Sequence, residues 1–474
     1  MTPEVQALID AAGGILAPSS LTGAPKLFLI QTKEHLTTLT RSVVVASPSG
    51  VLNVTEPSQI ARLEFINRWD VNAWALLDAT KPIVMFHAGV PFCLYDYFCQ
   101  ILSLPEVLPE YDGESERAGQ GLRPTVDFSA LATQDWPTEI PLSHDEKIAL
   151  GADADEDVNC HVDWTHYVAI KPVSQTRKGM VSELYMYALL FLFFHEQAHI
   201  ENGHLQYLCR KGAPLALCEF TNSEVDAAEE RMALELDADY TAATKSFIVL
   251  PSLPSWDVGD KTLDIIVRSY RLQLFAIGAL MFLIDHQVGR NRLGIKGWMT
   301  RLFGTRRSSH PSGMDRLLVC TSAIKKRLDA MPPSGKIFDL AMNSAMSDLM
   351  KVSSHLHLPY EDLRLGKSGP SILARLAKLK PQLVELARTF RSRVFVGDKE
   401  VSRHVALGVA QLQLGNSEVA LNEFTLALAG DLNEEERTMA FQGAAIAAQR
   451  LGRTDEANAY IREEFFLSNS ESKL

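Results

Sequence analysis

The most constraining feature of this chain is an apolar run at 185–194 that leads directly into the pentapeptide HEQAH at 195–199. The run is too short to cross a bilayer, which needs about 20 residues, and predicts a buried helix. On a helix, residues four apart share a face, so His195 and His199 can reach a single metal ion. Glu196 is angled to hold a metal-bound water instead of the ion. The pattern predicts a zinc site with hydrolase chemistry.

A third ligand is expected, because catalytic zinc sites have three protein ligands and an open position for water. The segment ELDAD at 235–239 lies on a second predicted helix. Glu235 can ligate the metal there. Asp239, four residues on, can accept a hydrogen bond from the free ring nitrogen of a ligand histidine. Arg231, one turn earlier, could orient Glu235.

Each motif also has an ordinary structural explanation. An HExxH sequence arises by chance on helices, and His195 and His199 extend an apolar face, so both could be packed core histidines. Arg231, Glu235 and Asp239 could form an exposed ladder of ion pairs. The two motifs follow one another in order on successive helices, and this agreement favours the metal site.

Composition narrows the class of protein. The chain has 474 residues, which predicts two to four domains, and a net charge of −12 without a dense basic tract, which argues against nucleic acid as a partner. Six cysteines without a CxxC pair predict reduced thiols in a cytoplasmic protein. We expect neither a signal peptide nor a transmembrane segment.

The distribution of turn residues and apolar periodicity predicts a mainly α (α+β) fold in four parts. The expected domains are an N-terminal mixed α/β region of unknown role, a zinc metallopeptidase domain, a helical connector and C-terminal helical hairpins, at 1–175, 176–330, 331–395 and 396–474. In the first domain we expect strands at 26–31 and 42–46 and a helix at 60–77.

The metal-binding domain is expected to be built from long helices. Ser182 is a predicted N-cap for the HExxH helix, which should end at Gly203 or Gly212. A near capping box at Ser223 opens the second helix, which runs to about Ser246. Later helices are expected at 263–288, after Pro311 and after Pro333.

The last segment, about 400–470, is repetitive. Small residues recur at close-packing positions, and Gly415 and Gly452 stand where inter-helix turns are expected. The pattern resembles tetratricopeptide (TPR) helix pairs, so a protein partner could bind this tail.

The order of motifs is similar to that of the M48 family of gluzincin metallopeptidases. HExxH is followed by ExxAD and then by the element HPxxxxR, which runs from His310 to Arg316. The resemblance implies a gluzincin-like core that binds Zn²⁺ through His195, His199 and Glu235, with Glu196 as general base. It also implies that His310 lies near the metal, either to stabilise the oxyanion or as an inhibitory fourth ligand.

The extended form HExxHxxxGH, which includes His204, also resembles phage-exclusion peptidases of the Lit type, which cut a translation factor. This resemblance covers a shorter stretch. His204 is rotated away from the ligand face, which favours a packing or surface role.

The main hypothesis is a zinc endopeptidase that hydrolyses peptide bonds of a protein or peptide substrate with a Glu-activated, metal-bound water. Zinc-dependent hydrolysis of a non-peptide amide is one alternative. Two others remain open. One is a catalytically silent scaffold that binds a partner through its TPR-like tail. The other is a defence or toxin peptidase with a single host target.

Overall fold

The fold is seen in a computed structural model, in which part of the chain is described. The described residues are 3–16, 23–41, 44–47, 50–53, 61–78, 81–116, 121–125, 128–133, 168, 170–210, 216–218, 225–248, 260–293, 311–329, 334–358, 369–394, 404–405, 408, 411–412, 417–429 and 434–471. They divide into two compact units, one of residues 1–199 and 212–378 and one of residues 200–211 and 379–474. The predicted four-part division stays a prediction.

A small mixed sheet lies in the first unit, in the order β3-β5-β4-β6. Strand β5 (Lys81–His87) pairs in parallel with β3 (Arg62–Ile66) and antiparallel with β4 (Ala73–Asp78). The short strand β6 (Ala216–Cys218) extends the sheet beyond β4. Helix α1 (Pro3–Ala11) packs on one face, where Val5 and Ile9 join a buried apolar cluster with residues of the strands.

Two predictions for this region are wrong. The segment 60–77 contains β3 and β4, not a helix. Its apolar spacing suits either structure, and pairing with β5 decides in favour of strands. The segment 26–31 belongs to helix α2 (Gly23–Arg41), not to a strand. Here Phe28, Thr32 and Leu36 form one buried helical face, which a six-residue window cannot reveal.

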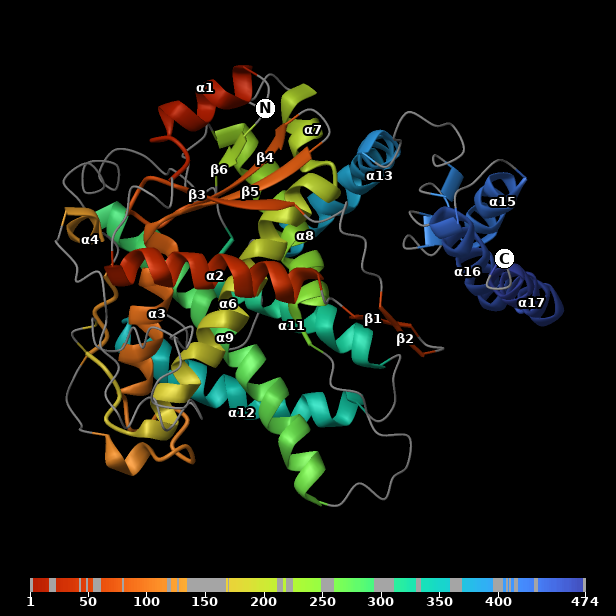
Figure 1. Ribbon diagram of the computed structural model, residues 1–474. Coiled ribbons are helices and arrows are strands. Elements are labelled where there is room, and N and C mark those ends of the chain that lie inside the picture. The colour runs from red at the N-terminus through yellow and green to blue at the C-terminus, as the bar shows by residue number, and fades with distance from the viewer. Residues whose placement is uncertain are drawn as a thin grey trace, which may run out of the picture. The chain divides into compact units, whose positions relative to one another are not determined.

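The predicted strand at 42–46 is confirmed. Strand β1 (Val44–Ser47) pairs antiparallel with β2 (Gly50–Asn53) in a separate two-stranded sheet. The mainly helical character of the chain is confirmed as well. In Figure 1 the larger sheet lies toward the top of the view, with helices α3 (Gly89–Leu102), α9 (Asp260–Leu293) and α12 (Ser334–His355) below it.

The HExxH helix is α6 (Gln175–Glu201), and it begins earlier than predicted. Ser182 lies inside this helix, while the hydroxyl of Ser174 accepts a hydrogen bond from the Arg177 backbone and acts as the cap. The predicted end is confirmed, because Gly203 follows with a φ of 78°. The ring of Tyr185 stacks on Phe28, so α2 packs against α6.

A buried arginine anchors the start of α6. The guanidinium of Arg177 is fully buried and donates hydrogen bonds to five backbone carbonyls in the segment that follows α3, those of Leu102, Leu104, Val107, Leu108 and Tyr111. All five acceptors are backbone carbonyl oxygens and none is a carboxylate. The arginine therefore ties a segment without regular structure to the first turn of the HExxH helix.

The later helices of the first unit follow the predicted order. They are α8 (Val225–Ser246), α9, α11 (Gly313–Asp329), α12 and the first part of α13 (Gly369–Val394), whereas the short helix α4 (Ser129–Thr133) was not predicted. Helix α11 packs against both α8 and α9, and α12 packs against α9. This arrangement brings α8 and α11 together, which matters for the site described below.

One of these helices is long and apolar enough to cross a membrane. It is the part of α9 from Leu263 to Gln287. In its most apolar window, 72% of the helix is buried inside the protein, and the buried core helix of a soluble protein meets the same criteria. Length and composition alone are weak evidence for a membrane span, so the expectation that none is present stays a prediction.

The second unit contains helical hairpins. Helices α15 (Ser417–Leu428), α16 (Glu434–Arg450) and α17 (Thr454–Glu471) pack around Phe424. Helix α7 (His204–Arg210) and the end of α13 also belong to this unit. The predicted turn at Gly452 is confirmed, with a φ of 74°, whereas Gly415 lies outside the described residues. The assignment as TPR repeats stays a prediction.

Candidate metal centre

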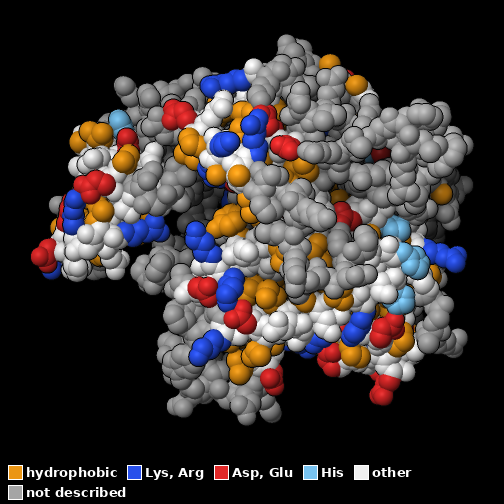
Figure 2. Space-filling view, turned by 180° about the vertical axis from the view of Figure 1, so that it is seen from behind, with side chains coloured by type: hydrophobic (Ala, Val, Ile, Leu, Met, Phe, Trp, Pro, Cys, Tyr) orange, Lys and Arg blue, Asp and Glu red, His pale blue; other side chains and the backbone are white. Residues whose placement is uncertain are grey.

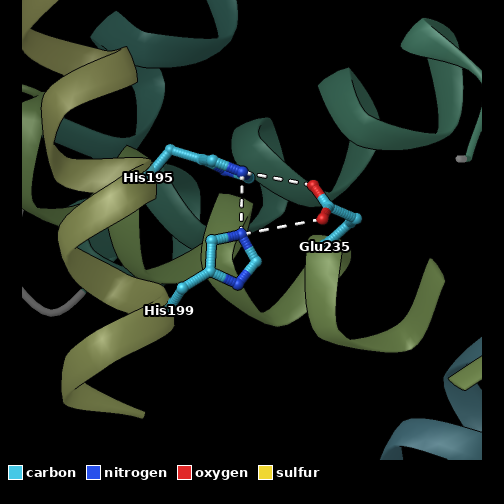
Figure 3. Close-up of side chains that lie close together, drawn as sticks. All are labelled: His195, His199 and Glu235. Atoms are coloured by element: carbon cyan, nitrogen blue, oxygen red, sulfur yellow. Dashed lines mark hydrogen bonds and ion pairs between the residues drawn. The ribbon is translucent and has the colours of Figure 1, made fainter. Parts of the chain in front are cut away.

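The two predicted helices bring three potential ligands together. His195 and His199 lie one turn apart on α6, and Glu235 reaches them from α8 (Figure 3). The two Nε2 atoms are 3.1 Å apart. The Glu235 carboxylate places Oε2 3.2 Å from His195 Nε2 and Oε1 3.7 Å from His199 Nε2. The exposed fraction of each side chain is at most 1%.

These separations fit a small divalent cation. Zinc bonds of about 2.0–2.1 Å in a tetrahedron place neighbouring ligand atoms about 3.3 Å apart. The separations of 3.1, 3.2 and 3.7 Å bracket this value. Two imidazoles and one carboxylate are also a donor set that catalytic zinc sites use. The cluster could therefore hold a metal ion, and the core-histidine alternative accounts less well for its converging donor atoms.

Asp239 supports His195 from the side away from the cluster. Its Oδ1 atom lies 2.9 Å from His195 Nδ1, which leaves Nε2 directed at Glu235. A carboxylate in this place fixes the tautomer and the orientation of a ligand histidine. The position of Asp239 agrees with its predicted role, and its effect on metal binding stays a prediction.

Charges in this enclosed site are strongly coupled. Burial by itself would lower the pKa of His195, but Asp239 and Glu235 outweigh burial, and the pKa lies well above its usual value. Burial would raise the pKa of Asp239, but Arg316 and His195 hold it below its usual value. The His195 ring thus lies between two carboxylates, and Arg316 offsets part of their negative charge.

The residue that the sequence interpretation left without a role is Arg316. Its guanidinium donates two hydrogen bonds to Asp239, from Nε to Oδ2 at 2.7 Å and from Nη2 to Oδ1 at 2.9 Å. Nη2 also lies 3.9 Å from Glu235 Oε2. The signal for it was present in the sequence, as the arginine of the HPxxxxR element. Only the packing of α11 on α8 shows which carboxylate it binds.

The structure leaves the roles of the remaining predicted site residues untested. Glu196 is buried on α6 beside His195, and its role as general base stays a prediction. Arg231 is half-buried on α8, and its effect on Glu235 also stays a prediction. His310 lies outside the described residues. His204 is fully buried in the second unit, which favours packing over a surface role.

A comparison with known protein families matches the part of the chain that contains this cluster. Residues 112–250 match the model of the Peptidase U49 family. This family comprises the Lit-type peptidases, and the matched region contains all three potential ligands. No curated protein and no solved structure matches the chain.

Of the two family resemblances seen in the sequence, the match supports the shorter one and not the main one. The Lit-type resemblance, which rested on the shorter motif, is the one that the family match supports. The resemblance to M48 gluzincins and to TPR proteins gains no such support. Residues 112–250 therefore match a Peptidase U49 domain, and this region contains the buried His-His-Glu group.

Proposed function

We propose that the protein is a zinc-dependent endopeptidase of the Lit type that cuts a single host protein in a defence role. The observation that carries the proposal is the position of the His195–His199–Glu235 cluster inside the matched region. The family match supports a peptidase, and the donor set supports a metal-dependent one. Zinc, the endopeptidase activity and the host target are parts of the proposal.

The proposed chemistry assigns one task to each residue. His195, His199 and Glu235 would hold the ion, which when bound acts as a Lewis acid on the scissile carbonyl and makes water more acidic. The Glu196 carboxylate accepts the proton from the attacking water and passes it to the leaving amine. For His310, which lies outside the described residues, the two predicted roles of oxyanion donor and inhibitory fourth ligand both stay open.

Burial of the site supports a narrow target range. Both histidines, Glu235 and Glu196 have at most 1% of their side chains exposed, so an arbitrary polypeptide does not meet the ligands at the surface. A substrate that opens the site by its own binding energy would be cut, whereas a generic one would not. This argument favours the defence hypothesis over a general protease.

The experiment is a proteome-wide cleavage assay. The zinc-loaded protein is incubated with a bacterial lysate, with and without a chelator, and new N-termini are identified by mass spectrometry. We expect one protein to be cut at one bond, only in the sample without chelator, and casein to remain intact.

The Glu196→Gln protein is the matched control for contaminating proteases. Cleavage of many unrelated proteins would contradict the narrow target range. Equal cleavage by the chelated sample would contradict metal dependence. Absence of any cut by zinc-loaded protein in lysates that contain the host target would favour the catalytically silent scaffold.

A further inference from the structure

Arg316 is built into the site by the local structure of α11. Ser312 caps the helix by accepting a hydrogen bond from the Asp315 backbone N–H at its Oγ, 3.1 Å away, and its hydroxyl donates to Asp315 Oδ2 at 2.8 Å. The backbone N–H of Gly313 donates to Asp285 of α9 at 2.6 Å. Arg316 stands in the first turn after this cap.

A glycine is required at the start of α11. A Cβ atom on Gly313 would lie 2.6 Å from the carbonyl oxygen of Met281. The first turn of α11 is thus pressed against the backbone of α9, and this contact fixes where the helix begins. Because the helix start is fixed on α9, the Arg316 side chain is aimed at α8.

We propose that Arg316 is a positioning residue for the metal. Its two bonds hold Asp239 in the orientation in which Oδ1 faces His195 Nδ1, and His195 Nε2 consequently faces the other ligands. The same guanidinium lies beside Glu235, so one side chain restrains two of the three ligands, one directly and one through Asp239. The inference rests on the proposed function only in requiring that the cluster binds a divalent cation.

A positioning role and a purely electrostatic role predict opposite effects of removing Arg316 on metal affinity. A positive charge near the cluster repels a cation, so removal of a purely electrostatic Arg316 would tighten metal binding. Removal of a positioning Arg316 would weaken binding, because Asp239 and His195 lose their fixed orientation. Metal affinity therefore separates the two roles without any measurement of activity.

The experiment measures binding of Zn²⁺ and Co²⁺ to metal-free protein. Zinc affinity is measured by competition with a chromogenic chelator, and the visible absorption of bound Co²⁺ reports whether the ion is four-coordinate. For Arg316→Gln we expect about 10- to 100-fold weaker zinc binding, the range typical for loss of a residue that supports a ligand. We also expect a weaker, altered cobalt spectrum.

Arg327 offers a matched control on the same helix. It donates hydrogen bonds to the backbone carbonyls of Thr244 and Phe247 at the far end of α8, so it joins α11 to α8 without contact to the cluster. Arg327→Gln should lower thermal stability and leave zinc affinity unchanged. Arg316→Lys should give an intermediate affinity, because lysine keeps the charge and loses the two-pronged geometry.

A double substitution tests whether Arg316 acts through Asp239. In an Asp239→Asn background, Arg316→Gln should weaken zinc binding by much less than in the wild-type background. Full additivity of the two effects would overturn the inference. If Arg316→Gln does not fold, Arg316→Lys and its cobalt spectrum provide the same comparison.

The outcomes separate this inference from the proposed function. Stoichiometric zinc in the wild-type protein with unchanged or tighter binding in Arg316→Gln would overturn the role of Arg316 alone. Absence of zinc binding by the wild-type protein would overturn both. Weaker binding in Arg316→Gln, unchanged binding in Arg327→Gln and non-additivity with Asp239→Asn together support the inference.

Discussion

At the scale of single residues, the potential metal ligands are distinct from Glu196, the predicted general base. His195, His199 and Glu235 converge on a space the size of a cation, while Glu196, the neighbour of His195, is not part of the converging group. Asp239 contacts the ligand His195, and Arg316 binds Asp239 in turn. The ligands, the general base and these supporting residues each predict a different effect of substitution.

Glu196→Gln should retain zinc and lose hydrolysis. The amide has nearly the same shape as the carboxylate but cannot accept the water proton, so we expect a loss of at least about 100-fold in turnover of the cut substrate. Zinc content by elemental analysis and the melting temperature serve as controls. A metal-replete Glu196→Gln protein with wild-type turnover would remove Glu196 from the mechanism.

Glu235→Ala and His195→Ala should each lose zinc. The loss of one of three ligands leaves a two-ligand site, which binds zinc too weakly to survive dialysis. The measurement is the zinc-to-protein ratio after dialysis, beside the wild-type protein. A ratio close to one in either variant would exclude that residue from the ligand set.

At the scale of elements, two buried contacts hold the helices in place. Arg177 fastens α6 to the segment after α3, and Gly443 of α16 allows α16 to approach Phe424 of α15. A single side chain decides each contact. Both can be tested by unfolding experiments.

Arg177→Met should destabilise the protein strongly. The substitution leaves buried carbonyl oxygens without a donor, and we expect the free energy of unfolding to fall by about 3–5 kcal/mol. Chemical denaturation measures this change. Lys178→Met, which removes a positive charge from the next and only half-buried position, should cost less than about 1 kcal/mol. Similar losses in the two variants would show that the carbonyl bonds of Arg177 contribute little.

Gly443→Ala should destabilise the helical hairpin although alanine favours helices. The added Cβ would lie 2.3 Å from Cζ of Phe424, and overpacking of this kind costs about 1–3 kcal/mol. Phe424→Leu should relieve the clash, so Gly443→Ala should cost less in that background. Thermal unfolding of the four proteins measures the coupling. An equal cost in both backgrounds would contradict the contact.

At the scale of the whole molecule, charges of both signs are mixed on the surface. The face shown in Figure 2 carries acidic and basic side chains interspersed over its described part. This distribution agrees with the acidic net charge and the lack of a basic tract. The absence of a nucleic-acid partner, the cytoplasmic location and a partner for the C-terminal hairpins stay predictions.

Metal removal should lower the melting temperature. An ion that binds only the folded state stabilises it by about 2.7 kcal/mol at a free concentration 100 times its Kd. Calorimetry with added zinc and with a chelator measures the shift. Glu235→Ala should show no shift between these conditions. A shift of equal size in this variant would place the stabilising ion elsewhere.

Much of the site could be predicted from the sequence. The spacings of HExxH and ExxAD place their residues on helix faces by local geometry, and the structure brings His195, His199 and Glu235 together. The strands at 62–66 and 73–78 could not be predicted in this way. Their apolar spacing is compatible with a helix, and only pairing with a third strand distinguishes the two structures.

The sequence by itself determined the two site helices and the types of ligand they carry, because helical periodicity is encoded within a few residues. The tertiary structure alone decided that Arg316, 77 residues beyond Asp239, binds its carboxylate. It also decided that Gly313 must lie against α9 and that the ligands are buried. These features depend on how separate helices pack, and packing is set by contacts between residues that are distant in the chain.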